Sequence, residues 1–158
     1  MPLIHLTTFI AAPVERVFDL SRSINLHRKT MNQYGEEVVA GKHTGLLELN
    51  ETVTWKAKHL FKERILKVKM TALNKPGYFI DEAVEGDFKK MKHEHYFKPV
   101  ENGTIMIDQL YFESPYGTLG KWFNVIYLEK YMQRLLTERN NMLKQVAESG
   151  HWKQYLQE

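Results

Sequence analysis

Residues 93–112, HEHYFKPVENGTIMIDQLYF, decide the fold of this chain. The dipeptide Asn102-Gly103 within this stretch is typical of tight hairpin turns. Apolar and polar side chains alternate before it, and the apolar run Ile-Met-Ile at 105–107 follows it. The stretch therefore predicts two strands joined by a short turn, and strands joined in this way are antiparallel.

The same strand pattern extends toward the N-terminus as far as Gly35. Glycine, asparagine and proline divide it at intervals, most clearly at 74–77, where Asn-Lys-Pro-Gly marks a turn. A further strand is expected at Leu3–Ile10. The other six strands are predicted near residues 35–41, 51–59, 63–73, 78–84, 88–98 and 104–113. Together they form a predicted seven-stranded antiparallel sheet.

Helical spacing replaces alternation in two regions. Residues 14–31 suggest two short helices with a break near Ser21–Ser23. From Thr118 to about Ala147, apolar residues recur at steps of three and four, which predicts one long amphipathic helix. Gly150 is the expected stop. We therefore expect one domain over 1–148, followed by a short tail over 149–158.

The order of elements indicates how the layers pack. One face of an antiparallel sheet has to be covered, and only the C-terminal helix is long enough to lie across it. The predicted fold class is thus α+β, with a curved sheet wrapped around the long helix and two short helices after the first strand. A cavity between sheet and helix is the expected place for function.

This succession resembles the helix-grip fold of the START-like, or Bet v 1-like, superfamily. Within it, the chain is similar to the ligand-binding branch known as SRPBCC, which includes polyketide cyclase-like and CoxG-like proteins. The resemblance covers Leu3 to about Lys144. It is carried by residues 10–18 (IAAPVERVF), 51–55 (ETVTW), 79–82 (FIDE), 86–88 (GDF), 93–97 (HEHYF), Asp108 and 115–120 (PYGTLG).

The resemblance implies a cavity for a hydrophobic or amphipathic small molecule, and in some members a cyclase or dehydratase activity. No residue pattern here singles out an enzyme, so we expect a ligand-binding protein without catalysis. The alternatives are a cyclase/dehydratase-like enzyme using cavity His and Asp side chains as acid and base, and a protein-interaction module with a vestigial cavity. No cofactor is expected.

Composition narrows the classes of protein further. The 158 residues contain no cysteine, which excludes disulfides, thiolate metal sites and a cysteine nucleophile. The N-terminus lacks the pattern of a signal peptide, and no apolar run could span a membrane, so a cytoplasmic location and no stable membrane association are predicted. The aromatic content is high, with 8 Tyr, 8 Phe and 3 Trp. A homodimer is left open.

The formal net charge is +3, and basic residues gather between positions 56 and 75. Lys56, Lys58, Lys67 and Lys69 are expected on the outer face of the sheet, opposite the apolar positions of their strands. The next strand carries acidic residues, including Asp81 and Glu82, beside them. We therefore expect cross-strand charge pairing and no nucleic-acid partner.

His93 and His95 stand two residues apart on a predicted strand and so share one face. Met91 and Phe97 have the same parity, which points the histidines toward the interior. The pair can be a buried hydrogen-bonded network, a ligand-binding or acid/base pair, or part of a metal site with His59 or Asp108. The network is favoured, and no metal is expected.

Asp108 is the preferred single candidate for a general base, alongside His93 and His95 as catalytic candidates. The parity of the strand from Thr104 to Phe112 is left open, because apolar residues occupy both of its faces. Asp81 and Glu82 are adjacent and so project to opposite faces. They cannot act together on one bond.

Aromatic residues are expected around the histidines, either as core packing or as cavity wall. Trp55 lies on an inward strand position, and Trp122 and Phe123 fall in the first turns of the long helix, near one end of the cavity. The predicted ligand-binding residues are Trp55, His59, His93, His95, Phe97, Asp108, Trp122 and Phe123.

Overall fold

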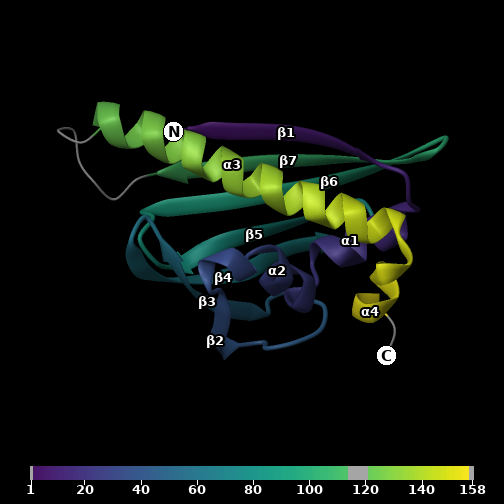
Figure 1. Cartoon of the computed structure of the whole chain (residues 1–158), viewed down its shortest axis with the longest axis horizontal. Helices are drawn as coiled ribbons and strands as arrows, with labels where there is room; N and C mark the ends of the chain where they lie inside the picture. Colours follow the sequence, from purple (N-terminus) through teal and green to yellow (C-terminus); the bar gives the residue numbers. More distant parts are fainter. Residues whose placement is uncertain (1, 114–120, 157–158) are drawn as a thin grey trace.

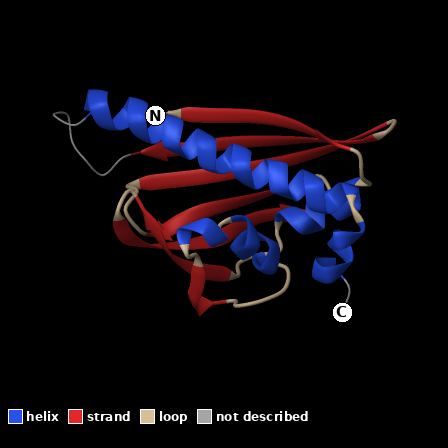
Figure 2. Ribbon diagram, in the orientation of Figure 1, coloured by secondary structure: helices blue, strands red, loops and turns tan. Residues whose placement is uncertain are grey.

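The computed structural model describes residues 2–113 and 121–156, with the backbone alone for 121–125. Its central element is a seven-stranded antiparallel sheet (Figures 1 and 2). The elements in chain order are β1 (Leu3–Ile10), α1 (Val14–Ser21), α2 (Ile24–Thr30), the 3₁₀ turn η1 (Asn32–Tyr34), β2 (Glu37–Gly41), β3 (Thr52–His59), β4 (Lys62–Asn74), β5 (Tyr78–Glu85), β6 (Lys90–Val100), β7 (Gly103–Glu113), α3 (Lys121–Glu148), the 3₁₀ turn η2 (Gly150–Trp152) and α4 (Lys153–Leu156).

The strand order in the sheet is β1-β7-β6-β5-β4-β3-β2. Consecutive strands are neighbours from β2 through β7, and β1 pairs with β7 at the edge. Helix α3 runs across one face of the sheet, with α1 and α2 beside it (Figure 1). The predicted α+β helix-grip architecture is confirmed. None of the described helices is long and apolar enough to cross a membrane.

The hairpin of β6 and β7 forms where the sequence predicts it, but its turn lies one residue earlier than the Asn-Gly dipeptide. Gly103 already belongs to β7, where it pairs with Val100. Its role is steric, because a Cβ there would collide with the carbonyl oxygen of Ile10 and come within 3.0 Å of the Cα of Ala11. Glycine lets the chain after β1 pass close against the hairpin.

The parity of β7, which the sequence leaves open, is decided by the structure. Along this strand buried and half-buried residues alternate strictly. The buried set faces the interior and comprises Thr104, Met106, Asp108, Leu110 and Phe112. Asp108 therefore lies on the same side of the sheet as His93 and His95.

Helix α3 buries one face against the sheet. Leu136, Leu143 and Ala147 are almost completely buried, and the spacing between them is that of one helix face. Asn140 lies on the same face and is also buried. Beyond α3, the predicted tail contains η2 and α4. There Trp152 lies against the core and under the guanidinium of Arg16, whose Cζ is 4.2 Å from the ring centroid.

Two of the four lysines expected on the outer face, Lys56 and Lys67, form ion pairs with acidic residues of neighbouring strands. The ammonium nitrogen of Lys56 lies 3.7 Å from a carboxylate oxygen of Glu37, on the next strand. That of Lys67 lies 3.8 Å from Glu85. Asp81 does not belong to this surface set: its carboxylate faces inward and bonds His95. Its inward parity follows from its position two residues after the buried Phe79.

Replacing Gly103 with alanine is expected to destabilise the protein by about 1–3 kcal/mol, because backbone atoms of the β1–α1 connection would have to move. Urea unfolding measures the change. Gly150→Ala is the control, since an added Cβ meets nothing within 4 Å there, and its effect should stay within about 0.5 kcal/mol. Equal effects at the two positions would contradict the steric role of Gly103.

Candidate functional site

A cavity of about 340 Å³ lies between the sheet and α3. Its wall is largely apolar, with side chains from the sheet, α2 and α3. Leu60, Arg64 and Asp87 line it at the strand connections β3–β4 and β5–β6, together with Tyr127 from the first half of α3. Further along, the apolar wall includes Trp55, Val68, Phe79, Met91, Leu110 and Leu135.

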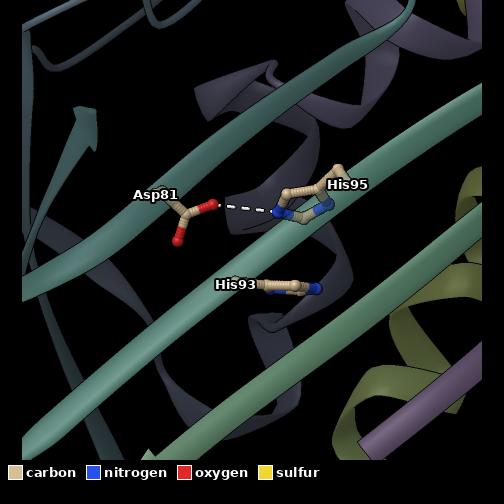
Figure 3. Close-up of side chains that lie close together, drawn as sticks. All are labelled: Asp81, His93 and His95. Atoms are coloured by element: carbon tan, nitrogen blue, oxygen red, sulfur yellow. Dashed lines mark hydrogen bonds and ion pairs between the residues drawn. The ribbon is translucent and has the colours of Figure 1, made fainter. Parts of the chain in front are cut away.

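Among the polar side chains of the wall, three lie close together: Asp81 from β5 and His93 and His95 from β6 (Figure 3). The strand register sets their positions. Asp81 lies directly opposite His93, and His95 lies directly opposite Asp108 of β7. Each histidine bonds the carboxylate diagonal to it, with 2.9 Å from His95 Nε2 to Asp81 and 2.9 Å from His93 Nε2 to Asp108. The two imidazole rings lie next to each other, with 3.7 Å between their centroids and an angle of 31° between their planes.

Asp108 is the centre of this network and has no exposed side-chain surface. Its Oδ1 accepts from His93, and its Oδ2 accepts from the amide of Asn140 at 2.7 Å. The guanidinium of Arg139 donates to Oδ1 at 3.4 Å. Nδ1 of His95 is also only 3.2 Å from Oδ1, but without hydrogen-bond geometry. The carboxylate is thus surrounded by donors from β6 and α3.

Arg139 extends the network from the sheet to the helices. One terminal nitrogen donates to Asp108 and also to Asn140, the latter at 3.0 Å, and the other donates to the carbonyl oxygen of Ser21 at 3.1 Å. Ser21 is the last residue of α1. A single guanidinium therefore connects β7, α3 and α1 inside the protein.

The network shifts the pKa values of its two aspartates and two histidines, and it does so in different directions for the two histidines. Burial by itself raises the pKa of Asp108 and Asp81, but the hydrogen bonds from histidines and the charge of Arg139 outweigh it, so both pKa values are lowered. Burial lowers the pKa of His93, with the neighbouring His95 adding to this. For His95, burial is overcome by the two carboxylates, which raise its pKa.

His59 and Trp55 also lie on the cavity wall, but they do not belong to the cluster of His93, His95 and Asp81. Nδ1 of His59 is 2.7 Å from the hydroxyl of Tyr131, and its ring lies 4.9 Å from that of Tyr34. Burial lowers the pKa of His59. The ring of Trp55 lies 4.5 Å from that of His27.

Two other predicted ligand-binding residues lie behind the wall. Phe97 is buried against Phe18 and Phe79, with ring centroids 5.2 and 5.9 Å away, so it supports the cavity without lining it. Asp108 also does not line the cavity, because it lies behind the rings of the two histidines. The side chains of Trp122 and Phe123 lie outside the described residues, as does the stretch 115–120 that helps to carry the resemblance.

The sequence reasoning missed three members of the network: Asp81, Arg139 and Asn140. Asp81 shares the parity of Phe79, and that alternation was the available signal. Asn140 continues the apolar spacing of Leu136 on α3, and a polar residue on the apolar face of a helix indicates a buried partner. Arg139 left no comparable signal.

Asp81, His93 and His95 also have the donor types of a metal site. One ligand atom from each lies within 4.8 Å of the others. The third ligand in this group is Asp81, whereas the sequence suggested His59 or Asp108. His59 instead contacts Tyr131, and Asp108 lies behind the histidine rings. An ion would have to replace the hydrogen bond of His95 to Asp81 with two bonds of about 2.0–2.2 Å. The network needs no such rearrangement to be hydrogen-bonded.

Comparison with solved structures places this fold among known ones. TTHA0849 from Thermus thermophilus superposes with a TM-score of 0.74 at 19% identity, covering 91% of this chain and 95% of that one. Major latex-like protein 151 from Panax ginseng gives 0.65 at 11% identity, over 94% and 98%. Ara h 8.0201, a Bet v 1-like allergen, gives 0.64 at 11% identity, over 90% and 97%.

A scan against protein-family models finds no match, and a search of the curated proteins finds none. The likenesses in structure, which extend over nearly the whole chain, define the class: a helix-grip protein. This is the fold that the sequence resemblance implies.

Replacing Asp108 with asparagine is expected to cost about 3–5 kcal/mol of unfolding free energy at pH 7, because His95 and Arg139 lose their buried counter-charge. The lowered pKa of Asp108 gives this contribution a pH dependence. It is fully present above the unfolded pKa of about 4 and is lost as pH falls toward the folded pKa.

Denaturant unfolding of both proteins between pH 7 and acid measures this contribution. The difference between wild type and Asp108→Asn should shrink below about pH 4. Glu113→Gln is the control on the same strand, since its carboxylate pairs at the surface with Lys89 and should change stability little. A difference that stays constant with pH would exclude an ionised Asp108 as the stabilising group.

Proposed function

We propose that this protein binds a hydrophobic or amphipathic small molecule in the cavity between the sheet and α3. The observation that carries the proposal is an apolar cavity of about 340 Å³ with a polar cluster in its wall. This volume lies within the usual range of small-molecule sites, about 300–1,000 Å³. Apolar walls supply contact area, and a few polar groups orient the ligand.

Apolar side chains around the strand connection β3–β4 support this proposal. Phe61 is 98% exposed at this turn, next to the cavity-lining Leu60. Ile65 lines the cavity and is 51% exposed. Exposed apolar groups beside a cavity suit the entry of an apolar molecule, since they offer it contacts before it is fully enclosed.

A second candidate is an acid/base enzyme of the cyclase or dehydratase kind. The observation that favours it is the 2.9 Å contact between His93 and the carboxylate of Asp108, which orients the imidazole. His93 would be the base and Asp108 its positioning residue. The third candidate, an interaction module with a vestigial cavity, is less favoured because the protein's own side chains leave the cavity open.

Ala57 of β3 lines the cavity, so a larger side chain at this position tests whether ligands bind there. Ala57→Phe is expected to abolish binding of the neutral fluorescent probe N-phenyl-α-naphthylamine, because the added ring takes up the space for it. Fluorescence titration measures the binding. Thermal unfolding of the free variant should show that the fold is kept, since the ring occupies existing space.

Lys58→Phe is the matched control, because it adds the same ring at the next position of β3, where the side chain is exposed. This variant should bind the probe as the wild type does. Probe binding that survives Ala57→Phe in a folded protein would mean that the probe binds elsewhere. Wild-type protein that binds no apolar probe would remove the proposed function.

A further inference from the structure

Asp108 determines which ring nitrogen of His93 carries the proton, and therefore whether this side chain offers a ligand a hydrogen-bond donor or an acceptor. Nε2 of His93 lies 2.9 Å from Oδ1 of Asp108. An ionised carboxylate only accepts, so Nε2 carries the proton. In the neutral imidazole the other nitrogen, Nδ1, then has no proton and accepts. Burial lowers the pKa of His93, which favours this neutral form. No described residue donates to this Nδ1, and His93 lines the cavity as an acceptor.

Asp81 adds a second acceptor beside it. Its Oδ2 accepts from His95 at 2.9 Å, while no described residue donates to Oδ1. The side chain keeps 18% of its surface exposed and lines the cavity. The close-up shows the carboxylate with one oxygen toward His95 and the other turned away from it (Figure 3).

The carboxylates of the cluster already have basic partners. His95 lies 2.9 Å from Asp81 and 3.2 Å from Asp108, and Arg139 lies 3.4 Å from Asp108. A ligand cation would have to compete with these partners, and burying its charge would be costly. A ligand anion bound at the open acceptors would bring a third negative charge beside the carboxylates of Asp81 and Asp108.

We propose that the ligand is an uncharged hydrophobic molecule carrying a hydroxyl group, an alcohol or a phenol, which donates its hydrogen bond to Asp81 or His93. The cavity discriminates against carboxylates and phosphates of the same hydrocarbon frame. This inference rests on the proposed function and specifies the ligand class for the same site. It needs no movement of the network, because the open acceptors are those that the network leaves free.

A matched series of naphthalene derivatives tests the hydrogen bond. β-Naphthol donates and accepts, its methyl ether only accepts, β-naphthoate is an anion, and β-methylnaphthalene has no polar group. Calorimetric titrations at pH 7 with EDTA present keep metal ions out of the measurement. We expect β-naphthol to bind about tenfold tighter than its methyl ether, as for a hydrogen bond to a charged group, and β-naphthoate to bind more weakly than β-methylnaphthalene.

Asp81→Asn should reduce the preference for β-naphthol over the ether and raise the relative affinity for β-naphthoate, because the negative charge is gone. The control is Glu82→Gln, which makes the same change at the next residue of β5, on the opposite face of the sheet. It should leave all four affinities as in the wild type. β-Methylnaphthalene serves as the reference for an intact cavity in each variant.

The outcomes separate the two proposals. If β-naphthoate binds as tightly as β-naphthol, or the methyl ether matches β-naphthol, the ligand class is overturned while the binding function stands. If none of the four compounds binds the wild type, the function itself fails. Even if Asp81→Asn does not fold, the wild-type series decides the ligand class.

Discussion

The buried carboxylate of Asp108 is the interaction on which the interior depends. A charge without exposed surface is costly unless it is fully paired. Here the partners are His93 on β6 and Asn140 and Arg139 on α3, with Nδ1 of His95 also near. Since these groups come from separate elements, the carboxylate is satisfied only when sheet and helix adopt one relative position. The apolar face of α3 provides the area of contact, and the network adds a specific register.

The same pairing gives the cavity its chemistry. By accepting from Nε2 of His93, Asp108 leaves the other nitrogen of that ring toward the cavity. By bonding only one oxygen of Asp81, His95 leaves the other oxygen free among the described residues. Structural groups in the core thereby set which hydrogen bonds remain for a ligand. The apolar wall then determines that this ligand has to be largely hydrophobic.

Most of the fold could be predicted from local patterns. Strand alternation, turn residues and the helical spacing after residue 118 depend on neighbours within a few positions, so they can be read from one chain. The inward direction of His93 and His95 followed from the same alternation. The two short helices followed from the helical spacing of their own apolar residues. The turn lies one residue before the predicted dipeptide, because Gly103 already pairs with Val100 in β7. The glycine there serves a different contact, since the backbone of Ile10, far away in the chain, leaves no room for a Cβ.

Sequence by itself thus determined the α+β order of elements, the antiparallel sheet and the inward-facing histidine pair. Only the tertiary structure decided that Asp108 faces inward, that Asp81 joins it, and that Arg139 reaches from α3 to β7 and α1. The physical reason is that local periodicity reports the face of a strand or helix. The partner of a buried charge, in contrast, depends on register between strands and on where a helix crosses them.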